Sequence, residues 1–217
     1  YLKAQIDYLL GQMYIAMGQP QDAYVVYLHA VNNYPLAYYA YLSLVELVYA
    51  GYPVDELQRG IVDYHAGQYG AALAAFERYL VAAPSDPYSA AYYQGLIFRA
   101  QMDYEAAVAQ WDLIIQASTE HALWDEAWEQ KGYTLWAYMD RYTEGQQTLL
   151  DFVSRAPTHQ RAAEFLFDAA RVAERDQRLE EAARLWERIP TEYPTSHYVL
   201  RSLMSAGLAR YRLHDYA

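Results

Sequence analysis

The chain has 217 residues, of which 54% are hydrophobic, 16% are aromatic and none is cysteine. Its formal net charge of −11 argues against nucleic-acid binding, which needs a basic face to neutralise phosphates. The absence of cysteine excludes disulfides, zinc fingers and thiol catalysis, and it favours an extracytoplasmic location over a cytosolic one.

Two stretches near the start of the chain share one pattern of small, aromatic and proline residues. The pattern consists of Gly11, Gly18, Ala23, Tyr27 and Pro35 in residues 9–35, and of Gly60, Gly67, Ala72, Phe76 and Pro84 in residues 58–84. We expect Gly60 and Ala72 to lie where two antiparallel helices cross closely, with Phe76 filling the space beside them. Gly67 then ends the first helix in a left-handed conformation, and Pro84 ends the second because proline cannot continue the hydrogen-bond ladder.

This helix hairpin recurs along the chain. The small residue of each first helix is Gly11, Gly60, Gly95, Gly132, Ala170 and Gly207, at intervals of 49, 35, 37, 38 and 37 residues. Periods of this length are typical of solenoids. The fourth copy reaches Tyr142 and Pro157 one residue late and carries Gly145 where alanine is expected, which indicates a one-residue insertion in its turn.

We therefore predict an all-α protein, a right-handed α-solenoid of about 12 helices that forms one domain over residues 1–217. The predicted hairpins cover residues 4–35, 53–86, 88–119, 122–157 and 160–194, and a half repeat follows at 196–217, in which residues 215–217 begin a second helix. The 49-residue interval holds an additional helix at residues 36–51. This apolar stretch falls short of the ~20 residues that a membrane span needs, so we expect it to be buried on both sides.

These residues resemble the tetratricopeptide repeat family over nearly the whole chain. A second similarity, to the superhelical, non-catalytic part of bacterial soluble lytic transglycosylases, depends on GQYGAALAAFERYL, DYEAAVAQWDLII and LWERIPTEYPTSHYVLRSLMSAGLARYRLHDYA. The catalytic domain of that family is recognised by a Glu-Ser step, and no such dipeptide occurs in these 217 residues.

The tetratricopeptide resemblance implies a concave groove lined by the first helix of each hairpin. The candidate groove residues are Tyr8, Gln12, Tyr64, His65, Tyr92, Arg99, Glu129, Tyr133, Trp136, Arg171, Glu174, Arg175, Tyr211 and Arg212. A groove of this composition suits peptides with acidic or apolar anchors. The subclass of the family that binds chaperone tails grips a terminal carboxylate with Lys and Asn, and the matching places here hold neither.

Tyrosine is unusually frequent, with 25 residues in the chain. Tyrosine is favoured at interfaces because it combines a large rigid ring with a hydrogen-bonding tip. Six tyrosines exceed what the repeat requires, and we predict that they form a self-association surface: Tyr34, Tyr38, Tyr39, Tyr41, Tyr49 and Tyr52.

No catalytic or cofactor-binding pattern occurs in the sequence. The six histidines are scattered singly, and the pair His121 and Asp125, one helical turn apart, lacks a third metal ligand. There is no glycine-rich phosphate loop and no nucleophile elbow. We expect no enzymatic activity, no cofactor and no metal.

Three functions remain open. The one we favour is a non-enzymatic protein-interaction or structural scaffold that assembles end to end into a filament or tube, because heterologous contacts propagate. Net charges of −4 in residues 1–58 and 0 in residues 141–217 would orient such contacts. The alternatives are a peptide-binding adaptor and the helical arm of a lytic transglycosylase that lacks its catalytic domain. In each case the expected partner is a protein or peptide, or a further copy of this chain.

Overall fold

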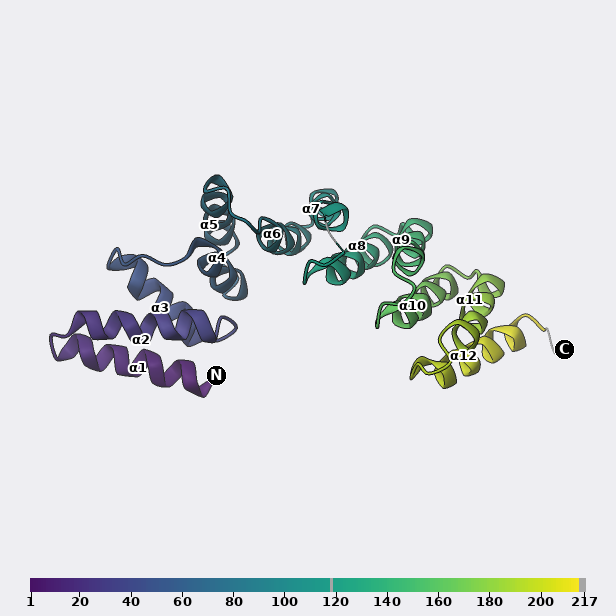
Figure 1. Ribbon diagram of the computed structural model, residues 1–217, viewed down its shortest axis with the longest axis horizontal. Coiled ribbons are helices and arrows are strands. Elements are labelled where there is room, and N and C mark those ends of the chain that lie inside the picture. Colours follow the sequence, from purple (N-terminus) through teal and green to yellow (C-terminus); the bar gives the residue numbers. More distant parts are fainter. Residues whose placement is uncertain (118, 215–217) are drawn as a thin grey trace. The chain divides into compact units, whose positions relative to one another are not determined.

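The structure, a computed structural model, describes residues 1–117 and 119–214, which form twelve α-helices (Figure 1). The helices are α1 (Leu2–Ala16), α2 (Pro20–Asn33), α3 (Tyr38–Tyr49), α4 (Glu56–His65), α5 (Tyr69–Val81), α6 (Tyr88–Ala100), α7 (Tyr104–Ala117), α8 (Trp124–Tyr138), α9 (Tyr142–Arg155), α10 (Ala162–Arg175), α11 (Leu179–Glu192) and α12 (Tyr198–Arg212). The prediction of an all-α protein with about 12 helices is confirmed. The predicted start of a further helix at residues 215–217 lies outside the described residues.

The chain divides into two compact units, residues 1–97 and 98–217, with the division inside α6. Helices that follow one another along the chain pack together: α1 with α2, α2 with α3 and α4 with α5 in the first unit, and each pair from α7 with α8 to α11 with α12 in the second. The single domain over residues 1–217 stays a prediction. None of the described helices is long and apolar enough to cross a membrane.

Small residues allow the two helices of a hairpin to approach each other. A Cβ atom added to Gly11 would lie 2.2 Å from Cε1 of Tyr27, and one added to Gly132 would lie 2.9 Å from Cδ2 of Leu149. Gly60 has the same relationship with Phe76. The predicted close crossings are therefore confirmed in these three hairpins, where a large side chain of the second helix occupies the space that glycine leaves.

The turn of each hairpin contains one residue with a left-handed backbone, two positions after the end of the first helix. These residues are Gly18, Gly67, Met102, Asp140 and Gln177, with φ values of 73°, 74°, 66°, 54° and 61°. The cap predicted at Gly67 is confirmed. Since residues other than glycine avoid this region, the turn geometry is imposed by the packing of the two helices and is not selected by the local sequence alone.

The fourth hairpin, α8 with α9, contains the expected insertion. In the second hairpin the N–H of Gln68 donates to the carbonyl oxygen of Asp63, five residues earlier, at 2.8 Å. In the fourth, the N–H of Arg141 donates to the carbonyl oxygen of Leu135, six residues earlier, at 2.9 Å. The additional residue is thus absorbed at the end of α8. A Cβ atom on Gly145 would lie 2.9 Å from Cβ of Trp136, which explains why no alanine stands there.

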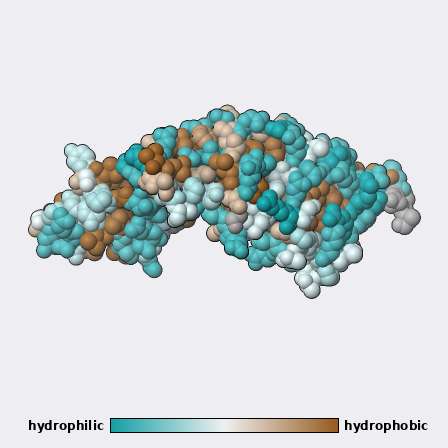
Figure 2. All heavy atoms as spheres, turned by 45° about the horizontal axis from the view of Figure 1, so that its top comes forward, coloured by the Kyte–Doolittle hydropathy of each residue, from teal (hydrophilic) through white to brown (hydrophobic). Residues whose placement is uncertain are grey.

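The structure corrects the prediction for the additional helix, α3. One face of α3, with Ala40, Leu44 and Leu47, is buried, and the helix packs on α2 and α1. On the other face Tyr38 is 65% exposed and Tyr49 is 93% exposed, so α3 is not buried on both sides. Figure 2 shows hydrophobic surface at the left, where Figure 1 places α1–α3.

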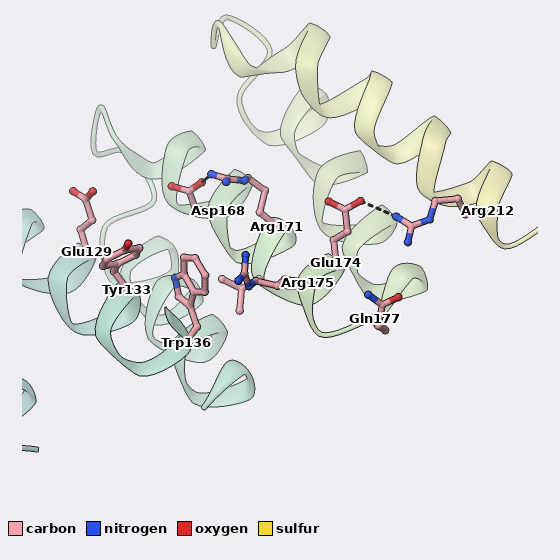
Figure 3. Close-up of a pocket in the computed structure, with 10 residues that line it drawn as sticks. Glu129, Tyr133, Trp136, Asp168, Arg171, Glu174, Arg175, Gln177 and Arg212 are labelled. Atoms are coloured by element: carbon pink, nitrogen blue, oxygen red, sulfur yellow. Dashed lines mark hydrogen bonds and ion pairs between the residues drawn. The ribbon is translucent and has the colours of Figure 1, made fainter. Parts of the chain in front are cut away.

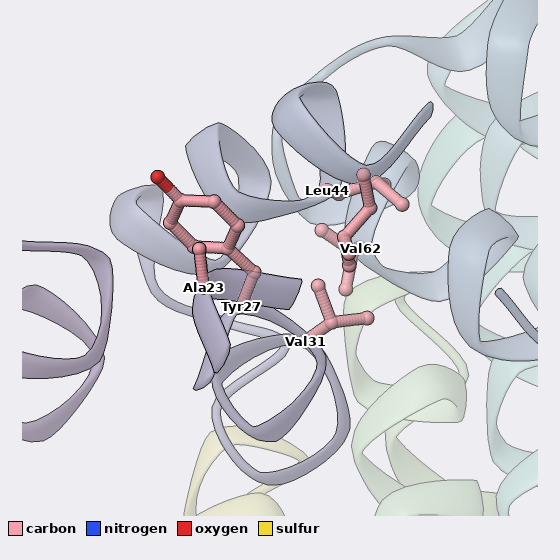
Figure 4. Packing of buried hydrophobic residues seen from close by; sticks show 6 residues of the cluster. Ala23, Tyr27, Val31, Leu44 and Val62 are labelled. Carbon is pink, nitrogen blue, oxygen red and sulfur yellow. The ribbon is translucent and has the colours of Figure 1, made fainter. Parts of the chain in front are cut away.

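Each unit has its own apolar core. In the first unit Ala23, Tyr27 and Val31 of α2 pack with Leu44 of α3 and Val62 of α4 (Figure 4). The second unit contains all five tryptophans of the chain, at positions 111, 124, 128, 136 and 186. Its core includes the stacked rings of Phe152 and Phe165, whose centroids lie 3.8 Å apart.

Candidate functional site

A cleft of about 720 Å³ lies among α8, α10 and α12 of the second unit (Figure 3). Its lining residues are Glu129, Tyr133 and Trp136 from α8, Asp168, Arg171, Val172, Glu174 and Arg175 from α10, Gln177 from the following turn, and Arg212 from α12. All three helices are first helices of hairpins, so the cleft lies on the side of the second unit that the repeat pattern predicts for the groove.

Helical spacing brings these side chains to the cleft. Glu129, Tyr133 and Trp136 are separated by four and three residues and therefore share one face of α8. Positions 168, 171 and 175 share one face of α10 for the same reason. Leu135 of α8 is buried and lies on another side of that helix. Gly132 lies three residues after Glu129 and four before Trp136, so the buried contact with α9 borders the face that lines the cleft.

Most charged groups in the cleft are ion-paired. Arg171 Nη1 lies 3.1 Å from Asp168 Oδ1, and Arg212 Nη1 lies 3.0 Å from Glu174 Oε1 (Figure 3). The carboxylate of Glu129 lies 2.5 Å from Nη2 of Arg161, the residue that precedes α10. Desolvation raises the pKa of the Asp168 carboxyl, and the positive charge of Arg171 opposes this shift. These pairs leave the cleft with little net charge.

Two arginines stack on the aromatic rings of α8. The Arg175 guanidinium lies over the Trp136 ring, with its Cζ 5.3 Å from the ring centroid. Trp136 meets Tyr133 edge to face, with centroids 5.2 Å apart and an interplanar angle of 84°. The guanidinium of Arg99 lies over Tyr133 at 5.7 Å. The two adjacent rings of Tyr133 and Trp136 therefore lie between two guanidinium groups, of which only that of Arg175 belongs to the lining of the cleft.

Seven of the predicted groove residues line this cleft: Glu129, Tyr133, Trp136, Arg171, Glu174, Arg175 and Arg212. Arg99 lies over the rings of Tyr133 and Tyr138 and is not among the lining residues. Tyr211 is exposed on α12. Asp168, Val172 and Gln177 also line the cleft and were not among the predicted groove residues, although Asp168 lies one turn before Arg171 on the same face of α10.

In the first unit, the predicted groove residues Tyr8 and Gln12 of α1 contact the additional helix α3. A single Nε2 group of Gln12 donates to Tyr27 Oη at 2.8 Å and to Glu46 Oε1 of α3 at 3.2 Å. The Tyr8 ring lies 5.7 Å from that of Tyr39. The additional helix α3 thus covers these residues.

The other predicted groove residues of this unit take part in an aromatic cluster on α4 and α6. Tyr64 and His65 both contact the Tyr93 ring, and Tyr92 meets the same ring edge to face. Burial lowers the pKa of the His65 imidazole, so this ring is held in its neutral form more strongly than a free one.

The six tyrosines of the predicted self-association surface fall into two groups. Tyr38 and Tyr49 are exposed, whereas Tyr34, Tyr39, Tyr41 and Tyr52 are half-buried. Tyr39 Oη accepts a hydrogen bond from Gln5 Nε2 at 3.1 Å, and the Tyr52 ring lies 5.1 Å from that of Tyr24. Part of the tyrosine surplus therefore packs inside the first unit.

The structure contains two further exposed apolar surfaces, whose residues were not among those predicted from the sequence. Each is a stripe on one helix whose members are between 50% and 71% exposed. The α1 stripe consists of Leu2, Ile6, Leu9 and Met13 together with Met17, the residue that follows α1, and the α12 stripe consists of Leu200, Leu203, Met204, Leu208 and Tyr211. Spacings of three and four residues run through both stripes, and this spacing could have identified them.

Comparison with known proteins gives the following matches. Residues 57–122 and 137–197 match a family model described as tetratricopeptide repeat, and residues 6–37 match a second model of the same description. Among solved structures, the crystal structure of a tetratricopeptide repeat protein from Parabacteroides merdae ATCC 43184 is 13% identical. That match covers 99% of this chain and 75% of the other, with a TM-score of 0.49. A search of curated proteins found no match.

Proposed function

Because this chain belongs to the tetratricopeptide repeat family, whose members bind proteins and peptides, we propose that it is a non-enzymatic scaffold that joins copies of itself end to end. The observation that carries the proposal is the pair of exposed apolar stripes on α1 and α12. Contiguous apolar surface of this kind is rare on monomeric proteins and marks interaction sites.

The spacing of both stripes suits side-by-side packing of two helices. Leu2, Ile6, Leu9 and Met13 follow one another at four, three and four residues, which is the spacing of a helix–helix seam. On α12, positions 200, 204, 207 and 211 repeat the same spacing. One of them is Gly207, beside which an added Cβ atom would meet nothing within 4 Å.

Gly207 indicates what kind of group α12 accepts. In the first, second and fourth hairpins the equivalent glycine is covered by a large side chain of the second helix, as Tyr27 covers Gly11. We infer that α1 of a second copy takes the position of a second helix beside α12, with an α1 stripe side chain over Gly207. Charge favours this occupant, because α12 carries three arginines and no carboxylate, while residues 1–58 carry one cation against five carboxylates.

A contact between different surfaces on the two copies is heterologous and propagates into a filament unless the rotation closes a ring. The full chain should therefore grow in mass with concentration in analytical ultracentrifugation. Leu9→Asp should disable the α1 stripe and Leu203→Asp the α12 stripe, so each variant alone should be monomeric. An equimolar mixture should form a dimer and nothing larger, since one intact stripe of each kind remains. Val81→Asp, at an 87% exposed position outside both stripes, is the matched control.

Three results would contradict the proposal. The first is a wild-type chain that is monomeric at every concentration, which would mean that some other group covers the stripes. The second is a Leu9→Asp variant that still dimerises, because α12 would then pair with itself. The third is a Val81→Asp variant that loses as much association as Leu9→Asp and Leu203→Asp do.

A further inference from the structure

We propose that Met13, Met17 and Met204 are modification sites, at which a peroxide oxidises the thioether to a sulfoxide and thereby releases the end-to-end contact between copies. This inference rests on the proposed function, because it concerns the regulation of the same two stripes. The starting observation is where the methionines of the chain lie.

Three of the five methionines belong to the apolar stripes. Met13 and Met17 are both 59% exposed in the α1 stripe, and Met204 is 69% exposed in the α12 stripe. Of the other two, Met102 is exposed in the turn before α7, and Met139 is half-buried after the end of α8. Each surface of the proposed contact therefore carries a thioether that a small oxidant can reach in the free chain.

Methionine supplies all the sulfur of this chain. Because there is no cysteine, no thiol competes for the oxidant. The oxidant is a peroxide from the surroundings, with hydrogen peroxide as the simplest case. The thioether sulfur attacks one peroxide oxygen, the S–O bond forms as the O–O bond breaks, and the second oxygen takes up the proton and leaves as water. The sulfur loses two electrons and the peroxide gains them.

A sulfoxide at these positions opposes the contact. Met13 continues the spacing of Leu2, Ile6 and Leu9, and Met204 lies three residues before Gly207. A thioether is flexible and apolar and fills the space between two helices, whereas a sulfoxide is polar. Between leucine and isoleucine side chains its oxygen has no hydrogen-bond donor, so burying it has the cost of any unpaired polar group.

The contact also decides which chains are oxidised. In the end-to-end assembly a neighbouring copy covers Met13 and Met204, whereas Met102 lies outside both stripes and stays exposed. Peroxide must reach the sulfur, so it reacts at the stripes of free chains and leaves assembled ones intact. Oxidised chains are then withdrawn from the association equilibrium, and existing assemblies shrink as they exchange with the free pool.

Analytical ultracentrifugation of the full chain before and after hydrogen peroxide treatment tests the proposal. Mass spectrometry of proteolytic peptides shows which methionines have gained an oxygen. We expect the oxidised chain to need at least about tenfold higher concentration than the untreated chain for the same growth in mass. Methionine sulfoxide reductases with a dithiol should restore association, because the sulfoxide returns to a thioether, its oxygen leaves as water and the dithiol becomes a disulfide.

Leucine variants locate the effect. Met13→Leu, Met17→Leu and Met204→Leu, made together, keep the apolar volume of both stripes and remove their sulfur. This triple variant should associate before and after peroxide as the untreated wild type does. Met102→Leu is the matched control, because Met102 is 75% exposed outside both stripes, and this variant should lose association on oxidation. Far-ultraviolet circular dichroism verifies that each oxidised sample is still folded.

A second measurement uses the wild type alone. With rising protein concentration, oxidation at Met13 and Met204 should slow, while oxidation at Met102 should keep its rate. Equal slowing at all three would mean that the stripes are not what the assembly covers, and it would overturn the inference.

Two further results contradict the oxidation proposal and leave the proposed function standing, because in both the untreated chain associates. The first is wild type that carries sulfoxides at positions 13 and 204 and still associates as the untreated chain does. The second is a triple leucine variant that loses association on peroxide treatment as wild type does. An untreated chain that is monomeric at every concentration contradicts the proposed function itself, and the oxidation proposal is then wrong with it.

Discussion

Gly60 of α4 and Phe76 of α5 lie so close that a Cβ atom on Gly60 would be 2.3 Å from Cε1 of the ring. Gly207 holds the equivalent place on α12, and a Cβ atom there would have no neighbour within 4 Å. The two glycines have the same place in the repeat pattern, but only Gly60 is confined by a neighbouring side chain. Alanine at position 60 therefore tests steric fit, and alanine at position 207 tests helix propensity.

We predict that Gly60→Ala destabilises the first unit by about 1–3 kcal/mol, the usual cost of overpacking a well-filled contact. Gly207→Ala should instead stabilise the second unit by up to about 1 kcal/mol, because alanine is the better helix former. Urea unfolding measures both effects. Circular dichroism follows the helices of both units, whereas tryptophan fluorescence follows the second unit alone, because the first unit has no tryptophan. The transition of the first unit is the part of the circular dichroism change that fluorescence does not share. Equal stability changes in the two variants would mean that Phe76 does not confine position 60.

Met102 and Gly67 occupy the same position in the turns of their hairpins and provide a second matched pair. Met102 has φ 66° and is 75% exposed, so its side chain contributes little packing to offset the strain of a left-handed backbone. We expect Met102→Gly to stabilise the second unit by about 0.5–1 kcal/mol, since relief of strain exceeds the entropy cost of glycine. Gly67→Ala should destabilise the first unit by about 1 kcal/mol. A loss of stability in Met102→Gly, measured by urea unfolding, would contradict this account.

The same positions explain why the fold was predictable from sequence. Small residues facing large aromatic ones at fixed offsets leave one packing solution, and the order Gly60, Gly67, Ala72, Phe76 already defines it. Glycine at the turn was a weaker guide, because tertiary packing holds Met102 in the same backbone conformation.

The additional helix α3 was less predictable. Apart from Ser43 and Glu46 it consists of apolar residues and tyrosines, and a sequence without a polar stripe does not reveal which side is buried. Its position over Tyr8 and Gln12 depends on tertiary contacts with α1 and α2, and those contacts removed two expected groove residues from the candidate site. In the second unit no additional helix intervenes, and there the pattern of first-helix faces predicted most of the lining of the cleft.

Asp63 of α4 should make the stability of the first unit depend on pH. This side chain is buried, at 5% exposure, and its nearest cation is Arg59, whose Nε lies 3.9 Å from Oδ2. Desolvation raises the pKa of the carboxyl from 3.8 to about 6, against the opposing effect of Arg59 and Arg78. The folded state therefore binds the proton more tightly than the unfolded state, so stability falls as pH rises from about 4 to about 6.

Asp63→Asn removes this titration. At pH 7.5 the variant should be more stable than wild type by on the order of 2 kcal/mol, and most of the difference should be lost near pH 4, where the folded carboxyl is protonated and the unfolded one, with a pKa of 3.8, is about half protonated. Circular dichroism during urea unfolding at both pH values measures the change. A variant that is less stable at pH 7.5 would mean that attraction to Arg59 outweighs the cost of burial.

Arg161 holds the beginning of α8 to the beginning of α10. Its guanidinium contacts four carboxylates: Asp125 at 3.2 Å, Glu126 at 3.4 Å, Glu129 at 2.5 Å and Glu164 at 2.8 Å. Desolvation raises the pKa of the Glu126 carboxyl, Arg161 opposes that shift, and the neighbouring carboxylates add to it. Without the arginine, four negative charges would face one another without compensation.

We predict that Arg161→Gln destabilises the second unit by about 2–3 kcal/mol at pH 7, less than the loss of one partner from a fully buried pair because the carboxylates are partly exposed. The remaining carboxylates should then have higher pKa values in the folded state than in the unfolded state, so the variant should regain stability as pH falls from 7 toward 5. Arg161→Lys keeps the positive charge but has fewer hydrogen-bond donors, so its stability should lie between those of wild type and Arg161→Gln. Tryptophan fluorescence during urea unfolding at pH 5 and pH 7 gives the comparison. A loss of the same size at both pH values would show that Arg161 acts through its packing on Phe165, over whose ring it lies at 5.2 Å, and not through its charge.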